Sequence, residues 1–140
     1  MVYVLDSNVL IAFLNNYDAL NRRAEKALTT LSSSGRLIVC GAVFAELVAS
    51  PALTEKYLEG FLHDAGIAVD WKFDENVWRA AGKAFRGYAE RRRKARSAHP
   101  RRLLADFLIG AHASVNNYPL LTLDDRLYRV SFPKLRLISA

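Results

Sequence analysis

Apolar residues along this chain fall into two alternating patterns. The first is a set of short, nearly continuous apolar runs at residues 2–5, 36–40, 67–71, 119–123 and 135–139. Runs of this length, bounded by polar or turn-forming residues, predict buried β-strands. Between them the apolar residues recur every three or four positions, as Val77, Ala81, Phe85 and Tyr88 do, and this spacing predicts helices.

The limits of the predicted helices come from capping and breaking residues. Ser7 or Asn8 is a suitable cap for a helix reaching about Asn15, and Thr54 and Asp74 are suitable caps for two later helices. Gly35, Pro51 and Gly66 mark where helices end. The pattern therefore predicts helices near 7–15, 19–34, 42–50, 54–66, 102–117 and 124–130, and a long one from residue 74 into an arginine-rich stretch.

Short apolar strands that alternate with helices predict an α/β fold. Parallel strands need crossover helices, which cover both faces of the sheet. We therefore expect one domain over residues 1–140, a three-layer α/β/α sandwich with a central, mostly parallel five-stranded sheet. In such open sheets, sites form at the carboxyl ends of the strands.

Composition narrows the class of protein. Of the 140 residues, 51% are hydrophobic and 24% charged, as in an ordinary globular domain, and no apolar run approaches the ~20 residues of a membrane span. The N-terminus lacks the basic flank and the cleavage site of a signal peptide. A single cysteine, Cys40, excludes an internal disulfide and is expected to be a core residue at a strand end. These features predict a cytoplasmic protein without a membrane partner.

Positive charge is concentrated in one segment. The whole chain carries a net charge of +6, and residues 86–102 alone carry a surplus of seven positive charges. A local basic patch is typical of a surface that binds a polyanion such as nucleic acid, although a solvated helix end has the same composition. The basic residues are Arg86, Arg91, Arg92, Arg93, Lys94, Arg96, Arg101 and Arg102.

Four of the fourteen acidic residues lie in apolar surroundings near predicted strand ends. Asp6 follows the first strand, Asp124 follows the fourth, Glu46 lies in the apolar helix after the second strand, and Asp106 lies among aliphatic residues in the helix before the fourth. Each alone has an ordinary explanation, since Asp is a common helix cap and either helical acid could face solvent. Gly110, one turn after Asp106, leaves room for a ligand, another backbone or close helix packing.

Clustered carboxylates repel one another unless cations neutralise them. Oxygen ligands suit Mg²⁺ or Mn²⁺, whereas His63, His99 and His112 are scattered and do not indicate zinc. An acidic metal site beside a basic patch favours metal-assisted hydrolysis of a phosphodiester polyanion, with one or two ions. The arginines would then hold the flanking phosphates.

Several motifs resemble the PIN domain family, and within it the VapC-type toxins of toxin–antitoxin pairs. They are "LDSNVLIAF" at 5–13, "AELV" at 45–48, "RRLLADFLIGAHA" at 101–113 and "LLTLDDRLYRVSFPKLRLI" at 120–138. The resemblance implies an endoribonuclease dependent on Mg²⁺ or Mn²⁺, with Asp6, Glu46, Asp106 and Asp124 as its catalytic and metal-binding acids. It also implies Ser7, Asn8 and Thr122 as supporting groups, and favours Asp124 over Asp125 as the fourth acid. A homodimer, an RNA substrate and a cognate antitoxin are implied partners.

Other functions remain open at this level. A phosphatase with Asp6 as nucleophile would need a second acid two residues later, where this chain has Asn8. A non-catalytic PIN-like module that binds RNA or protein would be expected to have lost some of the four acids. A stand-alone RNA-processing nuclease would share the site. Trp71 and Trp78 are expected to be core or interface residues, and Tyr88 to be core.

Overall fold

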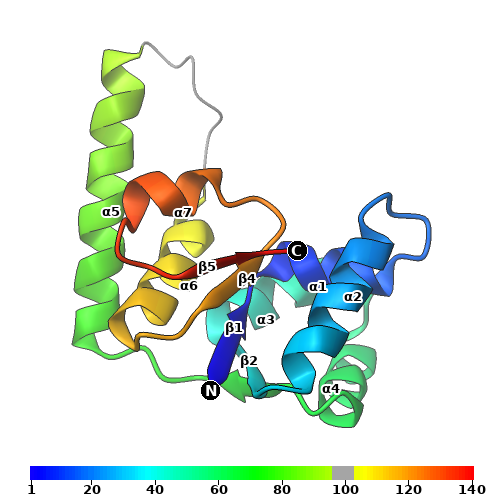
Figure 1. Cartoon of the computed structure of the whole chain (residues 1–140). Coiled ribbons are helices and arrows are strands. Elements are labelled where there is room, and N and C mark those ends of the chain that lie inside the picture. Colours follow the sequence, from blue (N-terminus) through cyan, green and yellow to red (C-terminus); the bar gives the residue numbers. More distant parts are fainter. Residues whose placement is uncertain (96–102) are drawn as a thin grey trace.

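The centre of the molecule is a five-stranded sheet with the strand order β3-β2-β1-β4-β5. This structure is a computed structural model and describes residues 1–95 and 103–140 (Figure 1). Every strand pairing in these residues is parallel, which confirms the predicted sheet. The strands are β1 (Val2–Leu5), β2 (Arg36–Cys40), β3 (Ala68–Asp70), β4 (Leu120–Thr122) and β5 (Leu137–Ser139).

Helices cover the sheet on both sides. Figure 1 shows α5, α6 and α7 gathered on one side and α1, α2 and α4 on the other, so the predicted α/β/α sandwich is confirmed. Both faces of the central strands are consequently buried, which explains why their sequences are continuous apolar runs and not alternating ones. The helices are α1 (Ser7–Leu14), α2 (Asn21–Ser32), α3 (Gly41–Val48), α4 (Glu55–Asp64), α5 (Glu75–Lys94), α6 (Leu104–Val115) and α7 (Arg126–Ser131).

Two predicted caps are confirmed and one is wrong. The Thr54 hydroxyl and the Asp74 carboxylate each accept a hydrogen bond of 3.1 Å from a first-turn backbone amide of α4 and α5. Gly66, just beyond α4, has a φ of 70°, a conformation that glycine adopts without strain. Ser7 does not precede α1 but is its first residue. Asp6 occupies the cap position instead, and its carboxylate makes no capping hydrogen bond.

The packing of α5 against α6 builds much of the core on one side of the sheet. The rings of Phe85 and Phe107 stack with centroids 4.7 Å apart, and Tyr88 is buried beside them, as predicted. Trp71 and Trp78 are 66% and 51% exposed, so they are not core residues, and the other expectation for them, a place in an interface, stays a prediction. They lie over Phe44 and Phe73 at the surface.

Cys40 is fully buried at the end of β2, as expected, and burial raises the pKa of its thiol to about 11. In the part of the chain that the structure describes, no helix has both the length and the apolar character needed to cross a lipid bilayer.

Candidate active site

The site begins at the carboxyl edge of the sheet, where β1 and β4 lie side by side. Leu5 is paired with Leu121, so the next residues along each strand, Asp6 and Thr122, emerge together. The backbone amide of Asp6 donates to the carbonyl of Leu121 at 2.9 Å. Asp6 is only 5% exposed and Thr122 is fully buried. The sheet register thus places one carboxylate in the interior at the edge where open parallel sheets form their sites.

Hydroxyl groups hold the carboxylate of Asp6. Thr122 and Tyr128 each donate to Oδ2 of Asp6 at 2.8 Å. Tyr128 comes from α7 and is 3% exposed. Two neighbouring elements, β4 and α7, therefore hold a carboxylate that follows β1, more than a hundred residues earlier in the chain.

Ser7 joins Asp6 to a second acid. Its hydroxyl donates to Oε1 of Glu46 at 2.8 Å and lies 3.5 Å from Oδ1 of Asp6. Glu46 is half-buried and projects from α3, which directly follows β2. Two of the four predicted acids are thus brought within reach of one serine hydroxyl.

The surroundings of Asp6 and Glu46 disfavour a negative charge on both carboxylates at once. Burial is the main cause that raises the pKa of Asp6, and the nearby charge of Asp106 raises it further. The pKa of Glu46 is also raised, first by burial and then by the charges of Asp106 and Asp6. Within residues 1–95 and 103–140, no basic side chain forms an ion pair with Asp6 or Glu46. A cation bound beside them would relieve this repulsion.

Asp106 lies in the first turn of α6. One of its carboxylate oxygens accepts a hydrogen bond of 3.2 Å from the backbone amide of Leu103, which stabilises the start of that helix. Gly110, one turn further, packs against the ring of Phe132 at the end of α7. Of the explanations left open for Gly110, the structure supports close packing.

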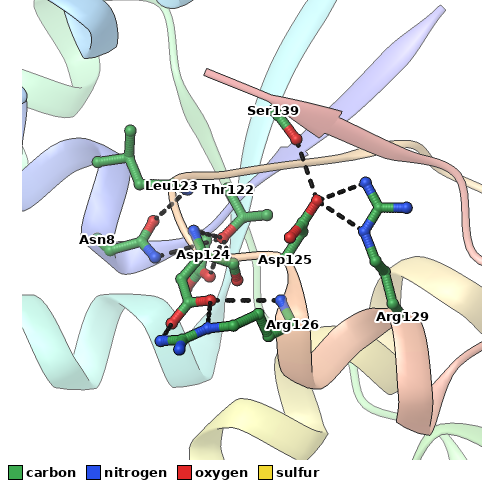
Figure 2. A network of polar contacts seen from close by, with 9 residues as sticks. Asn8, Thr122, Leu123, Asp124, Asp125, Arg126, Arg129 and Ser139 are labelled. Carbon is green, nitrogen blue, oxygen red and sulfur yellow. Dashed lines mark hydrogen bonds and ion pairs between the residues drawn. The ribbon is translucent and has the colours of Figure 1, made fainter.

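Asp124 and Asp125 point in opposite directions (Figure 2). Asp124 faces Arg126, whose Nε and Nη2 donate to its two oxygens at 3.0 and 3.1 Å. Asp125 faces Arg129, at 2.8 Å from Nε, and Ser139 at the end of β5, at 3.3 Å. These contacts turn Asp125 away toward β5.

Asn8 ties the start of α1 to the end of β4. Its amide donates to the Thr122 hydroxyl at 3.3 Å and accepts from the Leu123 backbone amide at 3.2 Å (Figure 2). The Thr122 hydroxyl in turn accepts from the backbone amide of Asp124 at 3.1 Å. The three residues expected to support the acids, Ser7, Asn8 and Thr122, therefore all hydrogen-bond within the site.

The four acids do not form a complete coordination shell for a metal ion. Among the residues that the structure describes, no three His, Cys, Asp or Glu side chains converge as they would around a bound metal ion. Asp6 and Glu46 lie together, whereas Asp106 and Asp124 are engaged by Leu103 and Arg126. The donor chemistry nevertheless fits Mg²⁺ or Mn²⁺, because the paired acids offer only oxygen ligands and no basic side chain among the described residues forms an ion pair with them.

A family model for the PIN domain matches residues 3–133 of this sequence. The chain belongs to the PIN domain family. This match confirms the family that the sequence motifs resemble.

Solved structures share the fold of this PIN domain over nearly the whole chain. VapBC2 from Rickettsia felis, solved with a promoter DNA fragment, aligns with a TM-score of 0.71 and 20% identity, covering 100% of this chain and 99% of that one. VapBC-1 from nontypeable Haemophilus influenzae aligns with a TM-score of 0.68 and 20% identity, covering 99% of this chain and 98% of that one. Mycobacterium tuberculosis VapC20, described as a toxin that cleaves the sarcin-ricin loop, aligns with a TM-score of 0.60 and 14% identity. The alignment covers 97% of this chain and 99% of that one. No curated protein sequence gave a significant match.

The described part of the basic segment, residues 86–94, lies in the C-terminal half of α5. Arg91 donates to the Ser131 hydroxyl of α7 at 3.3 Å, so the last turn of α5 lies beside the helix that follows Asp124. Arg86 pairs with Glu90 at 3.4 Å and stays exposed. Figure 1 shows the last turns of α5 extending past α7. Three of the predicted RNA-binding residues, Arg96, Arg101 and Arg102, lie outside the described residues.

Tyr128 was not among the site residues expected from the sequence. Its position four residues after Asp124, next to Leu127 on the buried side of a short helix, is the signal that could have suggested it. His112 was expected only to be one of three scattered histidines that do not indicate zinc. It is fully buried and its Nε2 lies 2.8 Å from Oδ2 of Asp70 at the end of β3. This contact ties α6 to the edge of the sheet.

Proposed function

We propose that this PIN domain is a Mg²⁺- or Mn²⁺-dependent endoribonuclease and the toxin of a type II toxin–antitoxin system, acting in the cytoplasm. One observation carries the proposal: Asp6 and Glu46 are brought together by Ser7 at the carboxyl edge of the sheet, without a basic partner in the described residues. An acidic pair of this kind, with Asp6 buried and Glu46 half-buried, offers the oxygen ligands that hard divalent cations bind.

In this proposal Asp6 and Glu46 hold the metal, and Asp106 and Asp124 supply further carboxylates from α6 and from the segment that follows β4. A bound divalent ion would activate a water molecule and stabilise the oxygen that leaves the phosphodiester. The other residues keep these acids in place. The Ser7 hydroxyl orients Glu46, and Thr122 and Tyr128 hold the carboxylate of Asp6.

RNA would approach along the basic end of α5. The contact between Arg91 and Ser131 supports this path, because it brings the end of α5 beside the helix that follows Asp124. Arginine and lysine side chains there would neutralise flanking phosphates and position the strand without reading its sequence.

An antitoxin and a second copy of the chain are the proposed protein partners. The antitoxin is supported by the solved structures that share this fold, several of which are described as toxin–antitoxin complexes. The acidic site offers a physical basis for inhibition, since an antitoxin arginine could pair with its carboxylates. Co-purification with the product of a small neighbouring reading frame, lost on high-salt washing, would test this pairing.

The nuclease proposal is tested by incubating the purified chain with single-stranded RNA and Mn²⁺, with and without a chelator. Cleavage should require the metal, and Asp6→Asn or Asp106→Asn should abolish it without unfolding the protein. Cleavage that continues in the chelator would refute a metal-dependent mechanism.

Neighbouring acids provide a matched control for this experiment. Asp124→Asn should reduce cleavage strongly, whereas Asp125→Asn should leave it near that of the unsubstituted protein, because Asp125 faces Arg129 and Ser139. Equal loss in both variants would show that the assignment of the fourth acid is wrong.

A further inference from the structure

The two oxygens of the Asp6 carboxylate have unequal surroundings. Oδ2 accepts hydrogen bonds of 2.8 Å from both Thr122 and Tyr128. Both donors are buried, so Oδ2 points toward the interior of the protein. A carboxylate oxygen has about two lone-pair directions available for hydrogen bonds or metal ions. Two short hydrogen bonds therefore occupy both lone-pair directions of Oδ2.

Oδ1 has a weaker contact with the protein. The Ser7 hydroxyl lies 3.5 Å away, at the outer limit of a hydrogen bond, and lies much closer, at 2.8 Å, to Oε1 of Glu46. A serine hydroxyl has one proton to donate, and the shorter distance assigns it to Glu46. Oδ1 thus lies on the side of Asp6 that faces the other acid.

We propose that Asp6 binds a divalent metal ion through Oδ1 alone, and that Tyr128 is the positioning residue which, with Thr122, keeps Oδ2 out of the coordination shell. Asp6 is then a one-oxygen ligand. It neither chelates an ion with both oxygens nor joins two ions through its two oxygens. This inference rests on the metal site of the proposed function and specifies how its most buried ligand is used.

The fold explains why a tyrosine can perform this task. Tyr128 lies in α7, the helix that begins just after Asp124, and α7 is held against the core by Phe132 at its end. Its phenol donates one hydrogen bond and has no flexible aliphatic chain, so its hydroxyl is held at a fixed point. Groups that hydrogen-bond to a metal ligand orient it, and their loss typically weakens metal binding about 10–100-fold.

The experiment is a calorimetric titration of the full-length chain with Mn²⁺ in the absence of RNA. Tyr128→Phe should weaken binding about 10–100-fold while the circular dichroism spectrum stays unchanged. Tyr3→Phe is the matched control. Tyr3 is also buried in the same domain, and its hydroxyl lies 3.0 Å from the Ser34 hydroxyl, but it lies near the start of β1, away from Asp6. It should leave the affinity unchanged.

A second pair of variants covers the other donor and keeps the test decisive if Tyr128→Phe folds poorly. Thr122→Val removes the hydroxyl at nearly constant volume and should weaken Mn²⁺ binding, whereas Thr122→Ser keeps the hydroxyl and should restore it. Infrared spectra of the carboxylate stretches on Mn²⁺ binding give a second readout. Their separation should narrow in Tyr128→Phe, as a two-oxygen binding mode becomes accessible.

The outcomes separate this inference from the proposed function. If Asp6→Asn abolishes Mn²⁺ binding but Tyr128→Phe and Thr122→Val bind as tightly as Tyr3→Phe, the metal site stands and the role of Tyr128 is refuted. If the unsubstituted chain binds no Mn²⁺, or Asp6→Asn binds it unchanged, both the metal site and this inference are overturned.

Discussion

Substituting Gly110 by alanine should test how closely α6 packs against the end of α7. A Cβ at this position would lie 2.7 Å from Cδ2 and 3.0 Å from Cζ of Phe132, and nearer still to Cε2. Carbon atoms in contact prefer about 3.5–4.0 Å, so the ring must withdraw by roughly 1 Å. Phe132 is 6% exposed, and its surroundings leave it little room to do so. Overpacking of this kind costs about 1–3 kcal/mol.

Alanine also has a higher helix propensity than glycine, worth about 1 kcal/mol within a helix. The net effect of Gly110→Ala on the free energy of unfolding should therefore be a loss between about zero and 2 kcal/mol. Gly82→Ala separates the two effects. Gly82 lies inside α5, and a Cβ there would meet no atom within 4 Å, so this variant should gain up to about 1 kcal/mol.

The assay is equilibrium unfolding in urea, with both variants measured beside the unsubstituted protein. The difference between Gly110→Ala and Gly82→Ala should be about 1–3 kcal/mol, with the urea slope unchanged. If Gly110→Ala stabilises the protein as much as Gly82→Ala does, Phe132 does not pack on α6 in this way. Close packing against Phe132 would then not be the reason for a glycine at position 110.

Two further predictions concern charge. The folded state raises the pKa values of Asp6 and Glu46, so above a pH of about 4 the folded chain holds protons that the unfolded chain has released. With a chelator present, the free energy of unfolding should therefore fall as the pH rises from about 4 through these raised pKa values. Asp6→Asn should flatten this dependence in urea titrations and raise stability at pH 7; an unchanged slope would contradict it. Replacing Arg91, Arg92 and Arg93 together by glutamine should weaken RNA binding and reduce the slope of log K against log salt by about 2, whereas an unchanged slope would mean that they only face solvent.

Much of the architecture was predictable because it depends on local patterns. The apolar run at 36–40 forms β2 with the predicted limits, and Thr54 and Asp74 begin α4 and α5 as expected. Burial on both faces of a parallel sheet leaves a continuous apolar signal, and a cap leaves a side chain of recognisable type. Tyr88 was assigned correctly to the core for the same reason, since it continues the buried stripe of α5.

The sequence-based predictions were wrong where contacts between residues distant in sequence determine the position of a side chain. Serine is a common helix cap, but Asp6 occupies the cap position of α1. The Ser7 hydroxyl instead donates to Glu46, 39 residues away in sequence. Trp71 and Trp78 are large and apolar, yet they are exposed and not in the core, with their rings against the smaller rings of Phe44 and Phe73. Sequence pattern does not specify which of several apolar residues lies outermost.

The sequence by itself determined the α/β class, the strand and helix positions, and the choice of Asp6, Glu46, Asp106 and Asp124 as unusual acids, since strand ends and apolar surroundings are local properties. Only the tertiary structure decided that Asp6 and Glu46 meet through Ser7, that Asp125 turns away, and that Tyr128 holds the buried carboxylate. The physical reason is that sheet register and helix packing set side-chain distances across more than a hundred residues of chain, as between Asp6 and Tyr128. No local pattern records those distances.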